Sequence, residues 1–283
     1  AENPDAVKER CLVMCKRIEP KSEEKKEESS ETGYVSIMDR LAIPKRGALK
    51  WEDGPYSSVP SIVQDTCLDT HAIYPVIRHN PALATEMLLA VLIDEPQEHY
   101  FGGSHHDRYS MHEPPRWYPP FFNRGPFLNY FRINPMEALK FTLKIVDFAT
   151  ERYLEEERHG GKPFEGITVE LAGEKKLYKG DQSVFSWHKD IGSAPHSLVS
   201  ILMAFEQFLY EKIEKKEPID EYVDYAIKNT NSLAIAGLLL VVAKIQPSLY
   251  KKELRHLLSV YEFYPWDLHT GGHDIFSFWG DLP

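Results

Sequence analysis

Apolar residues recur every three or four positions along most of this chain, which is the spacing of one buried helix face. Two of these stretches open with an Asn-Pro pair, at Asn80-Pro81 and at Asn134-Pro135. Asn is a good N-cap and Pro fits the first turn, so both pairs indicate helix starts. The pattern predicts helices over residues 6–18, 80–93, 134–158, 197–216, 219–229, 232–244 and 249–263.

One segment has a different period. Residues 166–171 alternate between apolar and polar positions, and Ala172-Gly173 follows them before a second short alternating stretch at 175–178. Alternation on both sides of a Gly-containing turn is typical of a hairpin. We therefore predict a small β-hairpin near residues 166–179, inserted between two helices.

The two helices that begin with Asn-Pro also resemble each other. Each has Ala four residues after the Asn, at Ala84 and Ala138, and the two copies lie 54 residues apart. HEAT and armadillo repeats are about 40–47 residues long, so an array of this kind would need insertions. We predict a mainly α fold, an α-solenoid or HEAT-like helical array with a small β-hairpin insertion. The alternative is that Asn-Pro is only a common helix start.

Composition divides the chain into three parts. Residues 1–20 are expected to form an N-terminal helix. Residues 21–34 follow as a flexible charged loop, because 21–31 mixes both signs of charge and contains no apolar side chain. Residues 35–283 would then hold the helical-repeat domain.

Charge and cysteine content limit the partners and the compartment. The net charge is −10 with a pI near 5.7, so binding of nucleic acid by the whole surface is disfavoured. Cys11, Cys15 and Cys67 give no disulfide framework, which favours a reducing, cytoplasmic location. The longest apolar run, 233–243, is too short to cross a bilayer and predicts a buried helix without a membrane partner.

A cluster of histidines is the first candidate for chemistry. Together with nearby carboxylates these side chains are of the types that bind zinc or manganese, and a metal-dependent hydrolase is one alternative function. Gly102-Gly103 and Pro114-Pro115 flank the cluster, so no helix can hold two histidines one turn apart. We therefore favour a solvated loop between helices. The cluster contains His99, His105, His106 and His112 with Glu98, Asp107 and Glu113, and a metal site would need His269, His273 or Asp274 to complete it.

Aromatic residues follow in a proline-rich stretch that contains Trp117, Tyr118, Phe121 and Phe122. Exposed aromatic side chains on a stiff segment can anchor a partner, so an interaction module anchored by Trp117 and Phe121 is a second alternative. The competing interpretation is an extended connection whose aromatic rings pack onto the helices.

Other chemical signatures are weak or missing. Glu165, Glu170, Glu174 and Lys176 faintly resemble the carboxylate and lysine layout of a metal-dependent nuclease, but the lysine follows the hairpin turn. The sequence contains no P-loop, no GxGxxG, no GxSxG and no CxxC motif. No catalytic, cofactor-binding or metal-ligating residue is assigned, and no cofactor is expected.

Residues 125–269 contain helix-rich runs such as GPFLNYFRINPMEALKFTLKIVDFATER and IKNTNSLAIAGLLLVVAKIQPSLY. On these runs the segment resembles the helical middle region of very large bacterial ATP-binding proteins, which include signal-transduction NTPases of antiviral defence. The resemblance implies a scaffold or sensor region without its own activity, because the NTPase core would lie outside such a segment. A chain without a starting Met and with an aromatic C-terminus fits a piece of a longer protein. The expected partners are other domains of that protein or a separate protein, and no small-molecule ligand is indicated.

Overall fold

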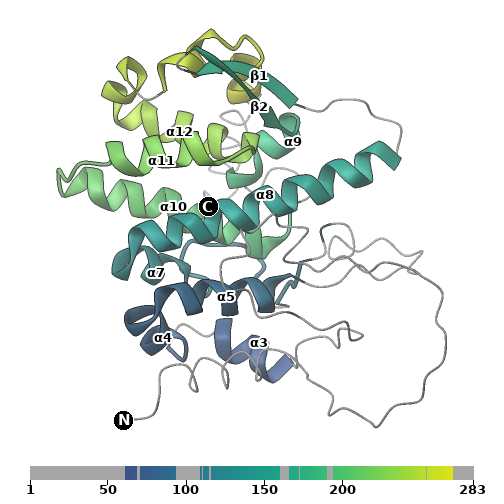
Figure 1. Cartoon of the computed structure of the whole chain (residues 1–283), viewed down its shortest axis with the longest axis vertical. Coiled ribbons are helices and arrows are strands. Elements are labelled where there is room, and N and C mark those ends of the chain that lie inside the picture. Colours follow the sequence, from purple (N-terminus) through teal and green to yellow (C-terminus); the bar gives the residue numbers. More distant parts are fainter. Residues whose placement is uncertain are drawn as a thin grey trace, which may run out of the picture.

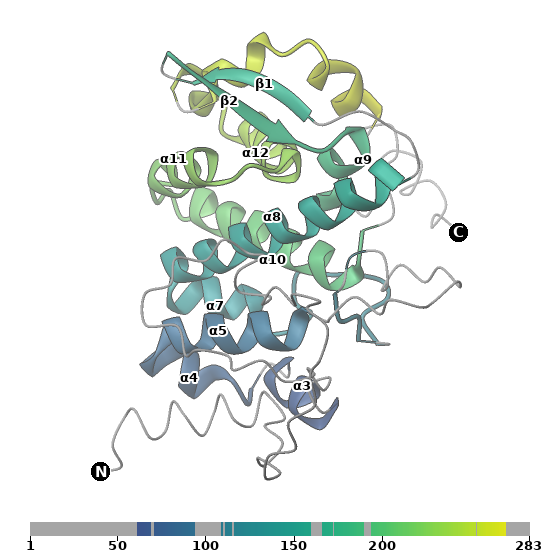
Figure 2. The same cartoon turned by 45° about the vertical axis from the view of Figure 1, so that its right-hand side comes forward.

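The computed structural model describes residues 61–68, 71–93, 109, 111–114, 116–159, 166–171, 173–189, 194–252 and 254–269. These residues are mainly helical, with one two-stranded antiparallel sheet. Figures 1 and 2 show the helices stacked along the longest axis, from α3 at one end to the hairpin at the other. The helices are α3 (Ser61–Leu68), α4 (Tyr74–His79), α5 (Pro81–Leu92), α7 (Phe127–Ile133), α8 (Pro135–His159), α9 (Gln182–Phe185), α10 (His196–Glu214), α11 (Asp220–Asn229), α12 (Leu233–Ile245) and a short helix at 263–269.

Both Asn-Pro pairs start helices, as predicted. Asn80 precedes α5 with φ −147° and ψ 75°, and Asn134 precedes α8 with φ −138° and ψ 75°. The two side chains differ in their bonds. The Asn80 side-chain oxygen accepts from the backbone N of Leu83 at 3.2 Å, whereas Asn134 Nδ2 donates to the carbonyl of Ile77 at 2.8 Å. The hydrogen bond of Asn134 therefore connects the α7–α8 corner to the end of α4.

The other helices predicted within the described residues are confirmed except the last. The predictions for 197–216, 219–229 and 232–244 correspond to α10, α11 and α12, and the apolar run at 233–243 is buried. The single helix predicted over 249–263 is wrong. Two 3₁₀ helices replace it, η2 (Pro247–Lys251) and η3 (Arg255–Ser259), and Lys252 between them has the non-helical angles φ −127° and ψ −99°.

The period of the buried residues explains that difference. Leu254, Leu257, Val260 and Phe263 are all buried and lie three positions apart. A spacing of three matches the three residues per turn of a 3₁₀ helix, whereas an α-helix would rotate this series away from the core. In the predicted α-helix, the buried apolar residues would instead follow one another at alternating spacings of three and four positions.

Helix α8 occupies the centre of the stack and packs against α5, α7, α10, α11 and α12. Its apolar side chains meet those of the neighbouring helices: the ring of Phe141 stacks on Phe127, with centroids 5.8 Å apart. The apolar stripe of α10 is also fully buried, and Phe131 of α7 stacks on Phe205 and Phe208 of this helix, each at 5.2 Å. The aromatic rings thus join three helices around one core.

The hairpin is confirmed as β1 (Gly166–Leu171) and β2 (Glu174–Lys179). Its strands pair in the register Leu171 with Glu174 through Gly166 with Lys179. Gly173 adopts φ +88° in the two-residue turn, a conformation that costs glycine little. Ile167, Val169 and Tyr178 point to the buried face.

Some predictions concern residues outside the described ranges. These are the helix at 6–18, the charged loop at 21–34, and Cys11 and Cys15, whereas Cys67 is described and is buried. Within the described ranges, none of the helices combines the length and the apolar character that crossing a bilayer requires.

Helix α12 approaches the short α9 helix closely at Gly237. A Cβ atom built on Gly237 would lie 2.2 Å from the carbonyl oxygen of Phe185, which is backbone and cannot rotate away. The missing side chain at this position therefore sets the distance between α12 and the α9 segment.

We predict that Gly237→Ala lowers the free energy of unfolding by about 1–3 kcal/mol, because forcing an atom into a packed core strains both backbones. Urea denaturation measures the change. Val241→Ala, at a half-buried position of the same helix, serves as the control and should cost less. In an exposed helix interior, replacing Gly by Ala would instead add about 1 kcal/mol. An unchanged or raised stability would contradict this account.

Candidate functional site

The predicted histidine cluster is described only in part. His99, His105, His106 and His273 lie outside the described residues. His112 is half-buried, and its backbone N donates to the carbonyl of Leu92 at 2.8 Å, whereas His269 is exposed at the end of the helix at 263–269. Among the described residues, no group of three or more His, Cys, Asp or Glu side chains is placed to hold a metal ion.

Glu113, from the same predicted cluster, has a structural contact. Its Oε1 accepts from the backbone N of His196 at 2.8 Å and lies 2.6 Å from the Nδ1 of the same residue. His196 is the first residue of α10, so the carboxylate satisfies one of the free N–H groups at that helix end. This contact connects the loop that contains Glu113 to the N-terminus of α10.

The loop holds its aromatic residues in two different ways. Trp117 is only 8% exposed and meets Phe127 edge-on, with centroids 5.7 Å apart. Tyr118 is 70% exposed, and Phe121 is 46% exposed. Of the two aromatic anchors proposed from the sequence, Trp117 therefore belongs to the core and only Phe121 faces outward.

We call Tyr118, Phe121, Phe122 and His196 the aromatic loop surface. The ring of Tyr118 lies 5.1 Å from that of His196, and the rings of Phe121 and Phe122 are 4.2 Å apart. The backbone N of Phe121 donates to Ser200 Oγ of α10 at 3.3 Å. Buried Trp117 and these polar contacts fix the exposed rings on a rigid helix.

A second group of polar residues joins α8 to the corner between α11 and α12. Asp147 Oδ1 accepts from Thr230 Oγ1 at 2.9 Å and from the backbone N of Asn231 at 3.0 Å. One turn further along α8, Thr150 Oγ1 lies 2.7 Å from Ser232 Oγ. Burial raises the pKa of Asp147 to about 6, although both hydrogen bonds and the nearby Lys176 favour its charged form.

The hairpin completes this junction through Lys176. Its Nζ donates to the carbonyls of Ile227 at 2.6 Å and Lys228 at 2.8 Å, which are the free carbonyls at the end of α11. Burial lowers the pKa of Lys176, and the charge of Asp147 opposes that shift. A lysine near a helix C-terminus also interacts favourably with the helix dipole.

The nuclease-like layout is not assembled among the described residues. Lys176 pairs across the hairpin with Val169 on the buried face, whereas Glu170 pairs with Lys175 on the opposite, exposed face. Glu174 is exposed beside the turn, and Glu165 lies outside the described residues. The carboxylate near Lys176 is instead Asp147, from a helix distant in sequence.

The polar residues before α10 also have structural contacts. Asp181 caps α9 through the backbone N of Ser183 and Val184, and it accepts from the hydroxyl of Tyr153 at 2.9 Å. His188 is fully buried, and its Nδ1 lies 3.1 Å from the carbonyl of Phe185, so this nitrogen carries the proton. Burial lowers the pKa of His188 to about 3, which keeps the ring neutral near pH 7.

Asp147 was not identified as a site residue from the sequence. A signal was present, because Asp147 stands between Val146 and Phe148 on a stretch whose apolar residues predict a buried face. A carboxylate at such a position needs partners, since an unpaired buried charge is costly. Those partners lie more than 80 positions away, where no local pattern identifies them.

Comparison with protein-family models gives no match, and comparison with curated proteins gives no significant match. The roles of the described polar residues are therefore inferred from their contacts in the structure. Asp147, Lys176, Asp181 and Glu113 each satisfy helix ends or corners. This arrangement joins helices and presents the aromatic loop surface.

We predict that Asp147→Asn removes part of the pH dependence of stability. The native pKa of about 6 exceeds the ordinary value of 3.8, so the native state binds more protons between these values. The contribution of this group to stability is therefore full below about pH 4 and falls as pH rises through 6, by on the order of 2 kcal/mol.

The Asn side-chain oxygen can still accept from Thr230 and Asn231, so the corner should remain bonded. Urea unfolding between pH 4 and pH 8 measures the difference between the variant and the wild type. Asp224→Asn is the matched control, because Asp224 is an exposed partner of Lys228. Equal pH slopes for Asp147→Asn and the wild type would show that the carboxylate is not desolvated.

Proposed function

We propose that this chain is a non-catalytic helical scaffold, built as an α-solenoid, within a larger bacterial nucleotide-binding protein. It would couple or sense through its aromatic loop surface, and its partner would be another domain of the longer chain or a separate protein. The proposal rests on the packing of the helices, on the use made of their polar groups, and on the resemblance of residues 125–269 described above.

The order of helix packing carries the proposal. α3 and α4 pack on α5, α5 and α7 pack on α8, and α8 also packs on α10, α11 and α12, so the helices follow one another along the stack with α8 in contact with both halves. A solenoid is built from units that contact mainly their neighbours, and the order of the helices along the stack supports such an arrangement. The corner before Pro247 repeats the geometry as well, because Gln246 has φ −118° and ψ 74°, close to the values at Asn80 and Asn134.

The loop surface supplies the recognition part of the proposal. Exposed aromatic residues contribute strongly to binding when they are held in place before the partner arrives. Tyr118 and Phe121 meet this condition, since Glu113 and Ser200 connect their loop to α10 and Trp117 is buried beneath it.

A solenoid predicts that the two ends of the stack open independently. Ile77→Ala in α4 should raise hydrogen exchange mainly in α3–α5, and Leu257→Ala in η3 mainly around α12 and the hairpin. Each side chain is buried, and its loss should cost about 2–5 kcal/mol locally. Hydrogen–deuterium exchange with mass spectrometry resolves the segments. Equal loss of protection throughout α3–α12 in both variants would indicate one cooperative globule.

The recognition surface is tested by the double variant Tyr118→Ala and Phe121→Ala. Its affinity for the rest of the longer protein, supplied as a separate polypeptide, should fall about 30-fold, as expected for the loss of about 2 kcal/mol at a hot spot. Isothermal titration calorimetry measures the affinity, and the melting temperature should stay within a few degrees of the wild type.

Two variants serve as controls for this experiment. Tyr261→Ala removes a ring that is 79% exposed at the hairpin end of the stack, and it should leave the affinity unchanged. Trp117→Ala should instead destabilise the fold by about 3–5 kcal/mol, because its ring is buried. Wild-type affinity in the double variant would reject the aromatic loop surface as the binding site.

A further inference from the structure

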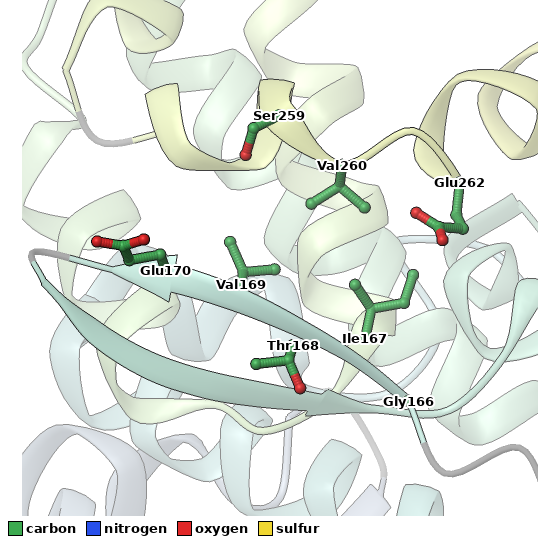
Figure 3. A pocket seen from close by; sticks show the side chains of 8 residues that line it. All are labelled: Gly166, Ile167, Thr168, Val169, Glu170, Ser259, Val260 and Glu262. Carbon is green, nitrogen blue, oxygen red and sulfur yellow. The ribbon is translucent and has the colours of Figure 1, made fainter.

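A groove runs along the edge of β1 that does not face β2. Residues 166–170 form one side, and Ser259, Val260 and Glu262 form the other (Figure 3). The groove has a volume of about 310 Å³. We call it the edge groove. It lies at the hairpin end of the stack, and the aromatic loop surface is carried by α10 and a different loop.

The hairpin register shows what this edge offers. Leu171 and Glu174 close the two-residue turn as a hydrogen-bonded pair, so Val169 with Lys176 and Ile167 with Tyr178 are hydrogen-bonded pairs too. The N–H and C=O groups of Thr168 and Glu170 therefore point away from β2. Both residues are exposed, and no other described residue takes these backbone groups as partners. This is an unpaired strand edge.

The charged side chains that line the groove favour a positively charged ligand. Ile167 and Val169 on one side of the groove, and Val260 on the other, are buried. Both charged residues of the lining, Glu170 and Glu262, are acidic, and Glu170 lies opposite Lys175 on the exposed face of the hairpin. Figure 3 shows Glu262 above Ile167 and Glu170 near the other end of β1. Residues 167 and 170 are separated by roughly 10 Å of extended strand.

We propose that the edge groove binds an extended, basic peptide segment as a third strand next to β1. The segment would exchange backbone hydrogen bonds with Thr168 and Glu170, as in other cases of strand addition. Lys or Arg side chains at alternate positions would lie near Glu170 and Glu262. This interaction goes beyond the proposed scaffold function and does not depend on the aromatic loop surface.

The probe is the synthetic peptide Ac-TKVKVKT-NH2 with a fluorescent label, titrated with the whole chain in an anisotropy assay. Two matched peptides accompany it: Ac-TEVEVET-NH2, with opposite charge, and a version of the lysine peptide in which both valines are replaced by proline. Saturable binding is expected for the lysine peptide only. Proline lacks the backbone N–H that the added strand would donate. The glutamate peptide is repelled by the carboxylates of Glu170 and Glu262.

Two kinds of chain variant separate backbone pairing from charge. Thr168→Pro removes an N–H that points away from β2, so the hairpin should persist while affinity falls about tenfold or more, and Thr168→Val should bind normally. Glu170→Gln with Glu262→Gln should weaken binding about fivefold and reduce its salt dependence, because the charges are solvent-exposed. Circular dichroism checks that every variant is folded.

Several results would overturn the proposal. These are no saturable binding of the lysine peptide, equal binding of the proline peptide, and unchanged affinity in Thr168→Pro. Sedimentation velocity tests the remaining occupant: a dimer of the wild type that Thr168→Pro disrupts would assign the edge to a second copy of the chain. Failure of peptide binding would leave the tests of the α-solenoid and of the aromatic loop surface unaffected, since they use other residues.

Discussion

Hydrogen bonds join the central helix α8 to the corner at 230–232. Asp147 and Thr150 stand one turn apart on the central helix, and they bond to Thr230, Asn231 and Ser232. The backbone N of Asn231 would otherwise need water at a partly buried corner. Removal of the carboxylate from water raises its pKa, which shows that the interaction has a cost as well as a benefit.

The hairpin depends on the same corner. Lys176 and Tyr178 both donate to the carbonyl of Ile227 at the end of α11, and the backbone N of Lys179 donates to the carbonyl of Asn231. An isolated two-stranded hairpin is only marginally stable in water. These bonds to α11 and the buried face of Ile167 and Val169 therefore explain how a two-stranded insertion keeps a fixed position in a helical protein.

The sequence predicts those parts of the fold that depend on local signals. The helix starts at Asn80-Pro81 and Asn134-Pro135, the buried α12 and the hairpin turn at Gly173 all follow from residues close together in the chain. The 3₁₀ turns between 247 and 259 were missed, because a short apolar series at a spacing of three resembles a helix when read loosely.

The candidate sites were harder to predict, since they depend on contacts between distant segments. The proline-rich stretch left two interpretations open, exposed aromatic anchors or rings packed onto the helices, and tertiary packing decided that Trp117 is buried and that Phe121 is not. Glu113 belonged to a metal hypothesis until its contact with His196 placed it at the start of α10. The partners of Asp147 and Lys176 lie about 50 to 80 positions away along the chain. No periodicity can identify partners at such a separation.

The uses of the charged groups support a scaffold more strongly than the missing motifs do. Catalytic acids and bases need a proton to exchange with a substrate, so their lone pairs or protons face a cleft. Asp147 and Lys176 have shifted pKa values, but their hydrogen bonds go to backbone and hydroxyl groups of neighbouring elements. These pKa shifts reflect desolvation where helices pack together. Structural hydrogen-bond networks shift pKa values as active sites do. Among the exposed features of the described residues, the aromatic rings at one loop and the strand edge with acidic walls both suit polypeptide partners.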